Sequence, residues 1–445
     1  MPEESVHVSG TMKIVVAQLG ARRHYAIPAM LNSAGSLERL FTDMCANTLS
    51  MRIVKTLLPS RWQPAGIRRL LAREVKGVPA SMISCFPSFA IRRIISRDRS
   101  ASVGDLYDTY SRVNREFGRL VCGNEWGNAN VVYVFNGAGL EILEQAKQRG
   151  MFTVVEQTDA PVPVEEGLLN EERERWPGWE QGGVSKAAWQ PMAEREIAEW
   201  KIADLILCGS EYVRRGVLDT FPPPGLTEVV PYGISPDLAL HGERHRLGNN
   251  PELMVLFVGT ICLRKGVPYL LEAAKQLKGI AKIRALGPVR VSESARAMLA
   301  EHIELVGVVP RSQVRQYYAT SDVLVLPSIS EGSANVCYEA IASGIPVITT
   351  PNAGSVIRDE KDGFILPIRA SDAIVDAIVR LAKDRELLNQ LGESAYHWAN
   401  EFTWERYSQR LVGTLRTAFE NRASSKAEWP GIEHAGEPRS LEPKK

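Results

Sequence analysis

The stretch PSISEGSANVCYEAIASGIPVITT, residues 327–350, decides the fold class of this chain. The apolar run at 323–326, directly before it, predicts a buried strand. Asn335 is the expected N-cap of a helix over 336–342. The run at 345–349 predicts the next strand. A strand, a helix and a second strand in this order are typical of a parallel α/β sheet.

Two glutamates, Glu331 and Glu339, stand in this stretch. Glu331 would lie at the carboxyl end of a parallel strand, where open α/β sheets bind ligands. Glu339 would lie in the first turns of the following helix, which Gly344 would end. Backbone N–H groups at a helix start suit a phosphate. Carboxylates suit sugar hydroxyls, because they only accept hydrogen bonds and a hydroxyl can donate one. The pattern predicts a sugar-nucleotide site; the other interpretation is a Gly-rich connection with two surface carboxylates.

Strand patterns alternate with helical patterns along most of the chain. The expected strands are residues 13–18, 131–135, 152–156, 204–208, 228–230, 254–258, 282–285, 303–306, 323–326 and 347–349. The expected helices between them are residues 138–148, 186–202, 268–277, 292–301, 311–319, 336–342 and 373–382. Such alternation implies parallel sheets with helices on both faces, and two blocks of it imply two doubly wound, Rossmann-like α/β domains.

The boundary between the two domains is expected in the polar segment HGERHRLGNNP, residues 241–251. We therefore expect an N-terminal domain over residues 12–240 and a C-terminal domain over residues 241–401. A last helical pattern covers residues 402–420. The tail at 421–445 is polar, contains three prolines and is expected to be disordered.

The composition narrows the class of protein. The chain has 445 residues and a net charge of +1, which gives no general attraction to nucleic acid. The first residues, MPEESVHVSGT, lack the pattern of a signal peptide, and no apolar run approaches the roughly 20 residues of a membrane-spanning helix. We expect a cytoplasmic protein. The cysteines show no CxxC or metal-ligand spacing and are expected to be reduced core residues: Cys45, Cys85, Cys122, Cys208, Cys262 and Cys337.

Residues 51–100 differ from the rest of the chain in charge. They contain eleven basic and two acidic residues, a net charge of +9. Isoleucines and leucines lie among the arginines, for example Ile67, Leu70 and Leu71. A basic amphipathic helix can bind an anionic membrane surface. The pattern favours peripheral membrane contact; the alternative is a solvated helix whose apolar residues face the core.

A second segment, FVGTICLRKGVPYLLEAAKQL at residues 257–277, follows the same plan as the first. A strand ends, a loop carries Arg264 and Lys265, and Gly266 precedes a helix. The two cations would face Glu331 across the same crevice. A guanidinium offers phosphate oxygens a bidentate fork, and an ammonium offers a point charge. Alone, the tripeptide Arg264-Lys265-Gly266 is more often a solvated turn. Beside the glutamates it indicates binding of a pyrophosphate.

The first expected strand runs into AQLGARRHYAIPAML, residues 17–31. Gly20 allows the backbone to approach a ligand closely. Polar groups follow at the carboxyl end of this strand: Arg22, Arg23 and His24. A single histidine is usually structural or solvated, so the loop as a whole is the stronger candidate.

These motifs together resemble glycosyltransferase family 4, the retaining, group 1 sugar transferases of the GT-B fold, over about residues 13–417. By this resemblance Glu331 would bind hydroxyls of the transferred sugar, and Glu339 would bind the ribose of the nucleotide. Arg264 and Lys265 would hold the pyrophosphate. The helix at 402–420 would cross back to the first domain. The remaining positions expected to contact the donor are Gly20, Gly332, Ser333, Ala334, Asn335, Val336 and Val309.

Two positions depart from the pattern of that family. An arginine often follows the glycine that ends the strand, and here Thr260 occupies this place. Arg264 next to Lys265 would replace it. Many members also carry a histidine near the reacting carbon, after a strand of the first domain. The candidates for its place are Asn136 and the run at 156–159.

The resemblance implies a retaining hexosyltransferase that moves a sugar from a nucleotide-diphosphate donor to a glycan or lipid-linked acceptor, without a metal or other cofactor. Front-face attack, with the leaving phosphate as base, would require no protein nucleophile. The basic segment favours capsule, exopolysaccharide or lipopolysaccharide assembly at the inner face of the cytoplasmic membrane. The alternatives are another GT-B enzyme, such as a sugar phosphorylase or an epimerase, and a non-catalytic protein that binds sugar nucleotides.

Overall fold

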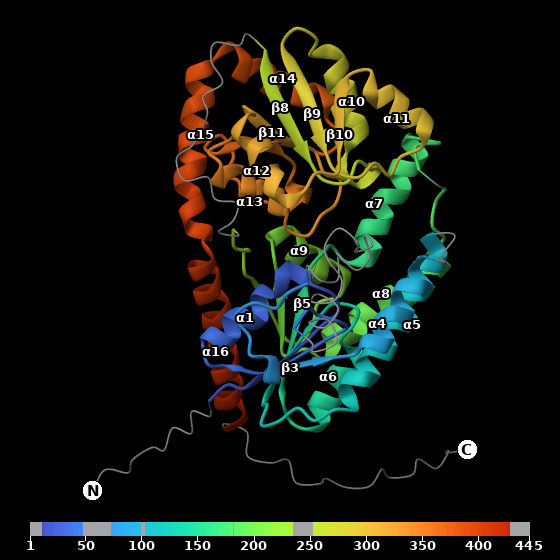
Figure 1. Ribbon diagram of the computed structural model, residues 1–445, viewed down its shortest axis with the longest axis vertical. Coiled ribbons are helices and arrows are strands. Elements are labelled where there is room, and N and C mark those ends of the chain that lie inside the picture. The colour runs from blue at the N-terminus through green and yellow to red at the C-terminus, as the bar shows by residue number, and fades with distance from the viewer. Residues whose placement is uncertain (1–10, 48–72, 99–102, 181, 235–251, 428–445) are drawn as a thin grey trace, which may run out of the picture.

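The chain folds into two parallel sheets, each covered by helices and stacked along the long axis of the molecule (Figure 1). The computed structural model describes residues 11–47, 73–98, 103–180, 182–234 and 252–427. The predicted fold class, two doubly wound α/β domains, is confirmed. The predicted linker at 241–251 lies outside the described residues, so the exact domain boundary stays a prediction.

The N-terminal sheet has the strand order β3-β2-β1-β4-β5-β6-β7, with all pairs parallel. Its strands are β1 (Ile14–Gln18), β2 (Leu37–Thr42), β3 (Ile83–Cys85), β4 (Val131–Phe135), β5 (Phe152–Gln157), β6 (Leu205–Cys208) and β7 (Leu226–Val229). Its α-helices are α1 (Ala26–Ser33), α4 (Pro87–Asp98), α5 (Val103–Cys122), α6 (Leu140–Gln148), α7 (Val162–Arg175), α8 (Lys186–Ile202) and α9 (Glu211–Thr220). The strand order reverses between β1 and β4, where Ile14 lies opposite Val131, and ligands bind open sheets at such points.

The C-terminal sheet has the analogous order β10-β9-β8-β11-β12-β13. Its strands are β8 (Leu253–Val258), β9 (Ala281–Leu286), β10 (Ile303–Gly307), β11 (Val323–Leu326), β12 (Val347–Thr349) and β13 (Gly363–Ile365). Its α-helices are α10 (Val267–Gln276), α11 (Glu293–Ala300), α12 (Arg311–Ala319), α13 (Asn335–Ala342), α14 (Ser371–Lys383) and α15 (Arg385–Ala399). Here the order reverses between β8 and β11, where Val255 lies opposite Val323. The loops after these two strands carry the cations and the glutamates singled out in the sequence.

The central strands are buried on both faces. Every residue of β1, β4, β5 and β11 is buried, and β4 and β11 show continuous apolar runs rather than alternation. Trp200 of α8 is fully buried behind the N-terminal sheet, and its Nε1 donates to Gln157 Oε1 at 3.0 Å. A rigid, fully covered sheet is what allows the loops at its carboxyl edge to hold fixed positions.

The last helix, α16 (Trp404–Ala427), leaves the C-terminal domain and runs along the N-terminal domain, where it packs against α1 (Figure 1). The Phe419 ring meets Phe152 edge-on at 5.8 Å, and Arg422 Nη1 donates to the Met151 carbonyl at 2.8 Å. The prediction of disorder from residue 421 is wrong at its start, because the helix continues to Ala427. Residues 428–445 lie outside the described part of the chain.

The sequence pattern did not predict several elements, including β2, β3 and β13. Strand β2 reads LERLFT and carries two charged side chains, Glu38 and Arg39, so it shows no apolar run. Strands β3 and β13 have only three residues each, too few to show a period.

Candidate functional site

Two loops of the C-terminal domain are packed together to form one wall of the site. Gly266 has a φ of +67°, which favours glycine, and a Cβ there would overlap the carbonyl oxygen of Pro327. The amides of Ile329 and Ser330 both donate to the carbonyl of Arg264, at 2.8 and 3.4 Å. The loop after β8 and the loop after β11 are thereby fixed against each other.

This packing brings Lys265 into direct contact with Glu331. The Nζ atom of Lys265 contacts Oε1 of Glu331, and both side chains are buried. Ser328 Oγ donates to the same Oε1 at 3.3 Å, and Arg264 Nη1 lies 4.0 Å from Oε2. Burial, with the neighbouring Arg264, lowers the pKa of Lys265 to about 8. The structure therefore unites the three side chains predicted to act on the leaving group and the sugar.

A third carboxylate, Glu165 of α7, reaches this cluster from the N-terminal domain. Its Oε2 lies 3.7 Å from Arg264 Nη1 and accepts a hydrogen bond from Ser330 Oγ at 3.4 Å. Burial raises the pKa of Glu165 to about 7, and the Arg264 charge opposes that rise. The sequence offered no signal for Glu165, because only the packing of one domain on the other places it here.

Replacing Glu165 with glutamine is expected to raise the melting temperature at pH 8 and to leave it nearly unchanged at pH 5. Since its pKa lies near 7 in the folded chain and near 4.5 otherwise, the folded chain holds a proton that the unfolded chain has already released. Stability is therefore lost as the pH rises from about 4.5 towards 7. The gain in the variant at pH 8 should be on the order of 1–3 kcal/mol. Thermal unfolding of both proteins at both pH values measures it.

The matched control for that comparison is Glu174→Gln, an exposed glutamate on the same helix. Its melting temperature should follow that of the unchanged protein at both pH values. A Glu165→Gln gain of equal size at pH 5 and pH 8 would contradict the assignment of a raised pKa.

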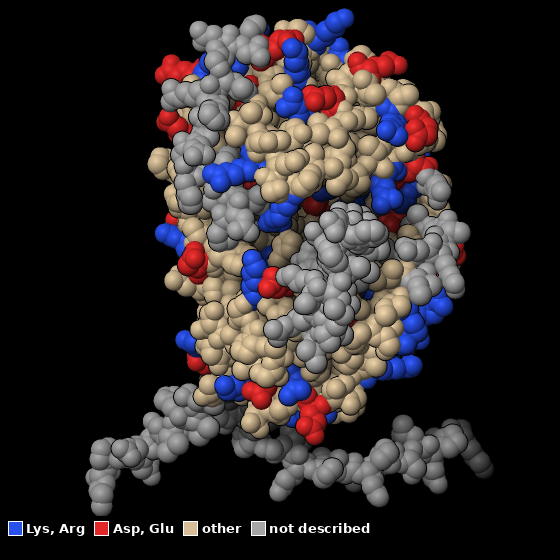
Figure 2. Space-filling model, viewed as in Figure 1, with Lys and Arg blue, Asp and Glu red and all other residues tan. Residues whose placement is uncertain are grey.

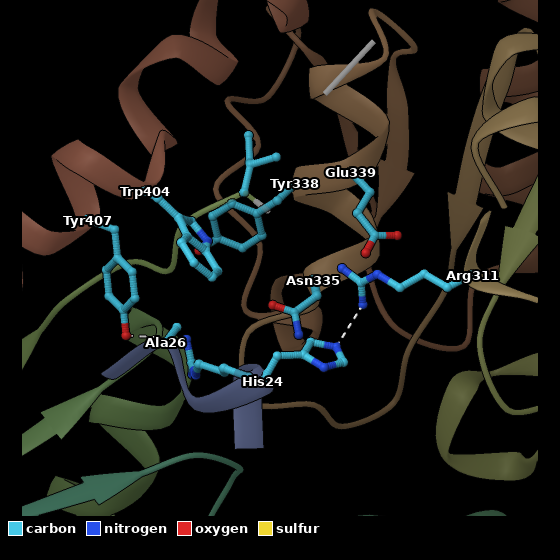
Figure 3. A pocket seen from close by; sticks show the side chains of 11 residues that line it. His24, Ala26, Arg311, Asn335, Tyr338, Glu339, Trp404 and Tyr407 are labelled. Atoms are coloured by element: carbon cyan, nitrogen blue, oxygen red, sulfur yellow. Dashed lines mark hydrogen bonds between the residues drawn. The ribbon is translucent and has the colours of Figure 1, made fainter. Parts of the chain in front are cut away.

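Glu339 lies on α13, about one turn after the helix begins at Asn335. Tyr318 donates to its Oε2 at 2.9 Å, and burial raises its pKa while Arg311 opposes the rise. Glu339 and Arg311 line a cavity of about 190 Å³ between the two domains (Figure 3). The residues around the cavity are Arg23, His24, Ala26, Gly233, Ile234, Arg311, Asn335, Tyr338, Glu339, Trp404 and Tyr407. Val309 is not among them, whereas Arg311, two positions later, is.

Helix α13 begins at Asn335, so the prediction that Asn335 caps it is wrong. The capping position is Ala334, which has no side chain to accept from the first turn. Asn335 is exposed and lines the cavity instead. The amide of Ala334 donates to Ala353 at 3.1 Å, so in this structure it is not available to a phosphate as the sequence had suggested. A helix start without a side-chain cap leaves its other amides suited to an anion.

The loop after β1 faces the C-terminal domain. Gly20 has a φ of +81°, and its amide donates to Oδ1 of the buried Asp43 at 3.1 Å. Gln18 Nε2 donates to the carbonyls of Gly20 and Arg22, at 3.0 and 2.9 Å. Side-chain bonds from the sheet therefore shape this loop, and they hold its polar residues at the domain boundary.

The two domains lie in close contact at Gly332, the residue after Glu331. A Cβ at Gly332 would overlap the carbonyl oxygen of Thr158 and lie 3.1 Å from the Cα of Asp159, at the end of β5. Ser210 Oγ, at the start of α9, donates to the Gly332 carbonyl at 2.5 Å. The N-terminal domain thus approaches the site through backbone, at a place where only glycine fits.

The two candidates for the place of the missing histidine, Asn136 and the run at 156–159, differ in their surroundings, and the choice between them stays a prediction. Asn136 is engaged within its own domain: Oδ1 accepts from Thr158 Oγ1 at 2.9 Å, and Nδ2 donates to Glu196 at 2.9 Å. The run at 156–159 instead reaches the glycine next to Glu331. The run therefore lies beside the predicted sugar site, as do Glu165 and Ser210 of the same domain.

For the sugar transfer that the family resemblance implies, replacing Gly332 with alanine is expected to slow the rate by on the order of 10-fold, because the added methyl forces Thr158 and its domain away from Glu331. Gly413→Ala, in α16, is the control: a Cβ there meets nothing within 4 Å, and transfer should continue at the normal rate. Steady-state rates of the three proteins measure the effect. Equal rates for Gly332→Ala and the unchanged protein would show that this contact is not part of the working site.

Two features are absent from the described residues. None of the helices in this part of the chain is long and apolar enough to cross a bilayer. Among the same residues, no three His, Cys, Asp or Glu side chains are grouped in a way that could hold a metal ion.

The family described as glycosyl transferases group 1 matches residues 243–398, which include the Arg264–Lys265 loop, both glutamates and α13. Over these residues the C-terminal domain is similar to the group 1 glycosyltransferases. A Mycobacterium tuberculosis protein named GDP-mannose-dependent alpha-(1-6)-phosphatidylinositol monomannoside mannosyltransferase is 26% identical over 239 residues, 48% of this chain and 62% of that protein. The D-inositol 3-phosphate glycosyltransferase of Kribbella flavida is 25% identical over 258 residues, 52% of this chain and 60% of that protein. The chain thus spans about three fifths of these glycosyltransferases.

Among solved structures, the sucrose-phosphate synthase of Thermosynechococcus elongatus is similar in fold over most of this chain. The match covers 92% of this chain and 100% of that one, with a TM-score of 0.65 and 17% identity. At this identity the likeness concerns the fold, which is GT-B: two Rossmann-like domains with facing loops. It extends the comparison to the N-terminal domain, which the family match does not reach.

Proposed function

We propose that this chain is a retaining glycosyltransferase that transfers a hexosyl group from a nucleotide-diphosphate sugar to a glycan or lipid-linked acceptor. The observation that carries the proposal is the buried contact of Lys265 with Glu331 at the switch point of the C-terminal sheet, facing Thr158 across the domain boundary. A carboxylate and two cations at one spot suit a sugar that is bonded to a diphosphate.

The chemistry assigns one task to each group. Arg264 and Lys265 would bind the diphosphate and stabilise the negative charge that develops on it as the sugar leaves. The start of α13 has no side-chain cap, so its dipole and free amides would favour a negatively charged group bound there. Glu331 would hold hydroxyls of the sugar, and Glu339 would hold the ribose. Attack from the face that the diphosphate leaves, with the phosphate as base, retains the anomeric configuration and needs no nucleophile from the protein.

The test is a panel of UDP-, GDP- and ADP-sugars, with nucleoside diphosphate release as the readout. Release that increases when an acceptor is added supports transfer. Release of a sugar phosphate that requires inorganic phosphate would indicate a phosphorylase, and a changed sugar with the nucleotide intact would indicate an epimerase. Thermal stabilisation by nucleotides without turnover of any donor would indicate a non-catalytic binding protein.

A lipid-linked acceptor fits a surface on helices α4 and α5. Ile91 and Ile94 of α4 are 52% and 41% exposed, and Arg92 lies exposed between them. The neighbouring α5 exposes basic side chains at helical spacing: Arg112, Arg115 and Arg119. Lys and Arg side chains gather along the edge where these helices lie (Figure 2). The predicted contact at 51–100 is described only in part, since residues 51–72 and 99–100 lie outside the described part of the chain. The Mycobacterium relative, by its name, acts on a phosphatidylinositol derivative.

Replacing Ile91 and Ile94 together with serine is expected to weaken binding to vesicles containing anionic phospholipid by about 10-fold or more, because two exposed apolar side chains no longer enter the bilayer surface. Co-sedimentation with vesicles of anionic or purely zwitterionic lipid measures it. The exposed Met298 of α11 provides the control variant, Met298→Ser, which should bind normally. Binding that is indifferent to anionic lipid would count against a membrane surface here.

A further inference from the structure

His24 and Arg311 form a hydrogen bond across the boundary between the two domains. His24 belongs to the loop between β1 and α1, and Arg311 is the first residue of α12. Arg311 Nη1 and His24 Nε2 are 2.9 Å apart, and both side chains line the cavity beside Glu339 (Figure 3). The tasks proposed for the donor-binding side chains leave this pair without a role.

The loop that carries His24 has an unusual backbone. Arg23, His24 and Tyr25 have φ values of 46°, 50° and 62°, so three consecutive residues other than glycine are left-handed. Such a conformation costs free energy and persists only where the surroundings impose it. Three contacts of neighbouring side chains do so: Gln18 Nε2 to the Arg22 carbonyl, Arg23 to Glu156 at 3.0 Å, and Tyr25 OH to the Met44 carbonyl at 3.2 Å. The result of this strain is that His24 projects towards the C-terminal domain.

Arg311 connects His24 with Glu339. Its guanidinium lies between the imidazole and the carboxylate (Figure 3), and its charge counteracts the raised pKa of Glu339. A nucleotide that binds Glu339 therefore meets a side chain already held by the other domain. Arg311 therefore takes part both in the contact between the domains, through His24, and in the binding of a nucleotide at Glu339.

The chemistry of this bond fixes the protonation of the imidazole. An arginine side chain has donors only, so His24 Nε2 must accept and must be unprotonated. Protonation would place two cations side by side and break the bond. Imidazoles change charge between about pH 5 and 8. The charged and titratable groups that line the cavity with His24 are Arg23 on its own loop, Arg311 from α12, Tyr338 and Glu339 from α13, and Tyr407 from α16. Arg22 and Tyr25 lie on the same loop as His24.

We propose that His24 and Arg311 are positioning residues that latch the two domains together over the bound nucleotide. The latch works while His24 is neutral and opens when it is protonated. The role of the nucleotide rests on the proposed function, whereas the latch between the domains does not.

The kinetic test compares His24→Ala, His24→Gln and the unchanged protein at pH 8. His24→Ala should raise the donor KM about five-fold, the effect of one ordinary hydrogen bond, with kcat little changed. In His24→Gln the side-chain oxygen can accept from Arg311, so the donor KM should stay near normal. A fall in kcat without a change in donor KM would overturn the proposal.

A double-variant cycle and a pH series separate the latch from a purely structural role. Adding Arg311→Ala to His24→Ala should raise the donor KM no further than Arg311→Ala alone, whereas additive effects would overturn the coupling.

Between pH 8 and pH 5.5 the donor KM of the unchanged protein should rise more than that of His24→Gln. Glu165, whose pKa is also near 7, is present in both proteins. The difference between their pH profiles of donor KM therefore reports the protonation of the imidazole alone. Superimposable pH profiles would also overturn the proposal.

Hydrogen exchange without nucleotide tests the latch independently of any activity. Amides of residues 22–26 should exchange about five-fold faster in His24→Ala than in His24→Gln at pH 8, after correction for intrinsic rates. The control is His302→Ala. The exposed His302 directly precedes β10, at the amino-terminal edge of the C-terminal sheet. Faster exchange in a protein that turns over no donor would support the latch and refute the proposed function. Equal exchange in both His24 variants would refute the latch itself.

Discussion

Lys265→Ala is expected to lower the rate of sugar transfer by on the order of 10²–10³-fold. The buried ammonium of Lys265 lies where a leaving diphosphate would gain charge, beside Glu331 and next to Arg264. In a buried, poorly solvated site a fixed cation stabilises such charge far more than water does. The loss should therefore appear in kcat as well as in kcat/KM. Nucleoside diphosphate release under saturating donor measures it.

Two further variants keep this prediction falsifiable. Removing Lys265 leaves Glu331 buried beside fewer partners, which can destabilise the fold. Lys265→Gln retains a donor for Glu331 and should fold normally while remaining slow. Lys275→Ala, an exposed lysine at the end of α10, should transfer sugar at the normal rate. A folded Lys265→Gln protein with a normal rate would contradict the assignment of Lys265 to the leaving group.

Glu331→Gln is expected to lower the transfer rate by a similar factor, on the order of 10²-fold, while nucleoside diphosphate binding is retained or tightened. The amide has the shape of the carboxylate but accepts hydrogen bonds more weakly, so the sugar hydroxyls are bound less firmly at this position. The diphosphate loses a negative neighbour of Lys265, so its affinity should not fall. Calorimetric titration with UDP and GDP, beside the rate measurement, separates the two effects.

The control for that variant is Glu272→Gln, on the outer part of α10. It should change neither the rate nor nucleotide binding. If Glu331→Gln weakens nucleotide binding and leaves turnover of the remaining bound donor intact, Glu331 acts on the nucleotide rather than on the sugar.

The part of the site predicted best from the sequence is the pair of loops in the C-terminal domain. Both follow apolar runs that could only be buried strands, and both precede helices, so Lys265 and Glu331 had to reach the same sheet edge. Their direct contact depends on Gly266, which lets one loop lie on the other. The motif and the fold agree here because local pattern alone determines where these residues lie.

Residues that reach the site from the other domain could not be predicted in this way. Glu165 lies in a helix whose apolar pattern is weak, and Gly332 meets Thr158 only because the two domains are packed together. Asn335 was misassigned for a different reason: the helix starts one residue earlier than its preferred cap residue suggests, and helix ends are the least certain part of a sequence-based prediction. Contacts between domains follow from tertiary packing, which no short stretch of sequence encodes.

The same contacts explain how the cleft can exclude water. Ser210 holds the Gly332 carbonyl, Arg369 bonds Glu172 at 2.5 Å, and Tyr269 donates to Glu172 at 2.8 Å, all across the domain boundary. A donor held between such surfaces meets the acceptor before it meets bulk water. Domain closure is therefore expected to govern the ratio of transfer to donor hydrolysis.

The most direct measurement of the central claim is donor turnover by the unchanged protein and by Lys265→Gln, side by side, across UDP-, GDP- and ADP-sugars. If the cleft is a sugar-nucleotide site served by Lys265, at least one donor releases its nucleoside diphosphate, and Lys265→Gln releases it about 100-fold more slowly. Equal release by both proteins, or no release from any donor with any acceptor class, would contradict it.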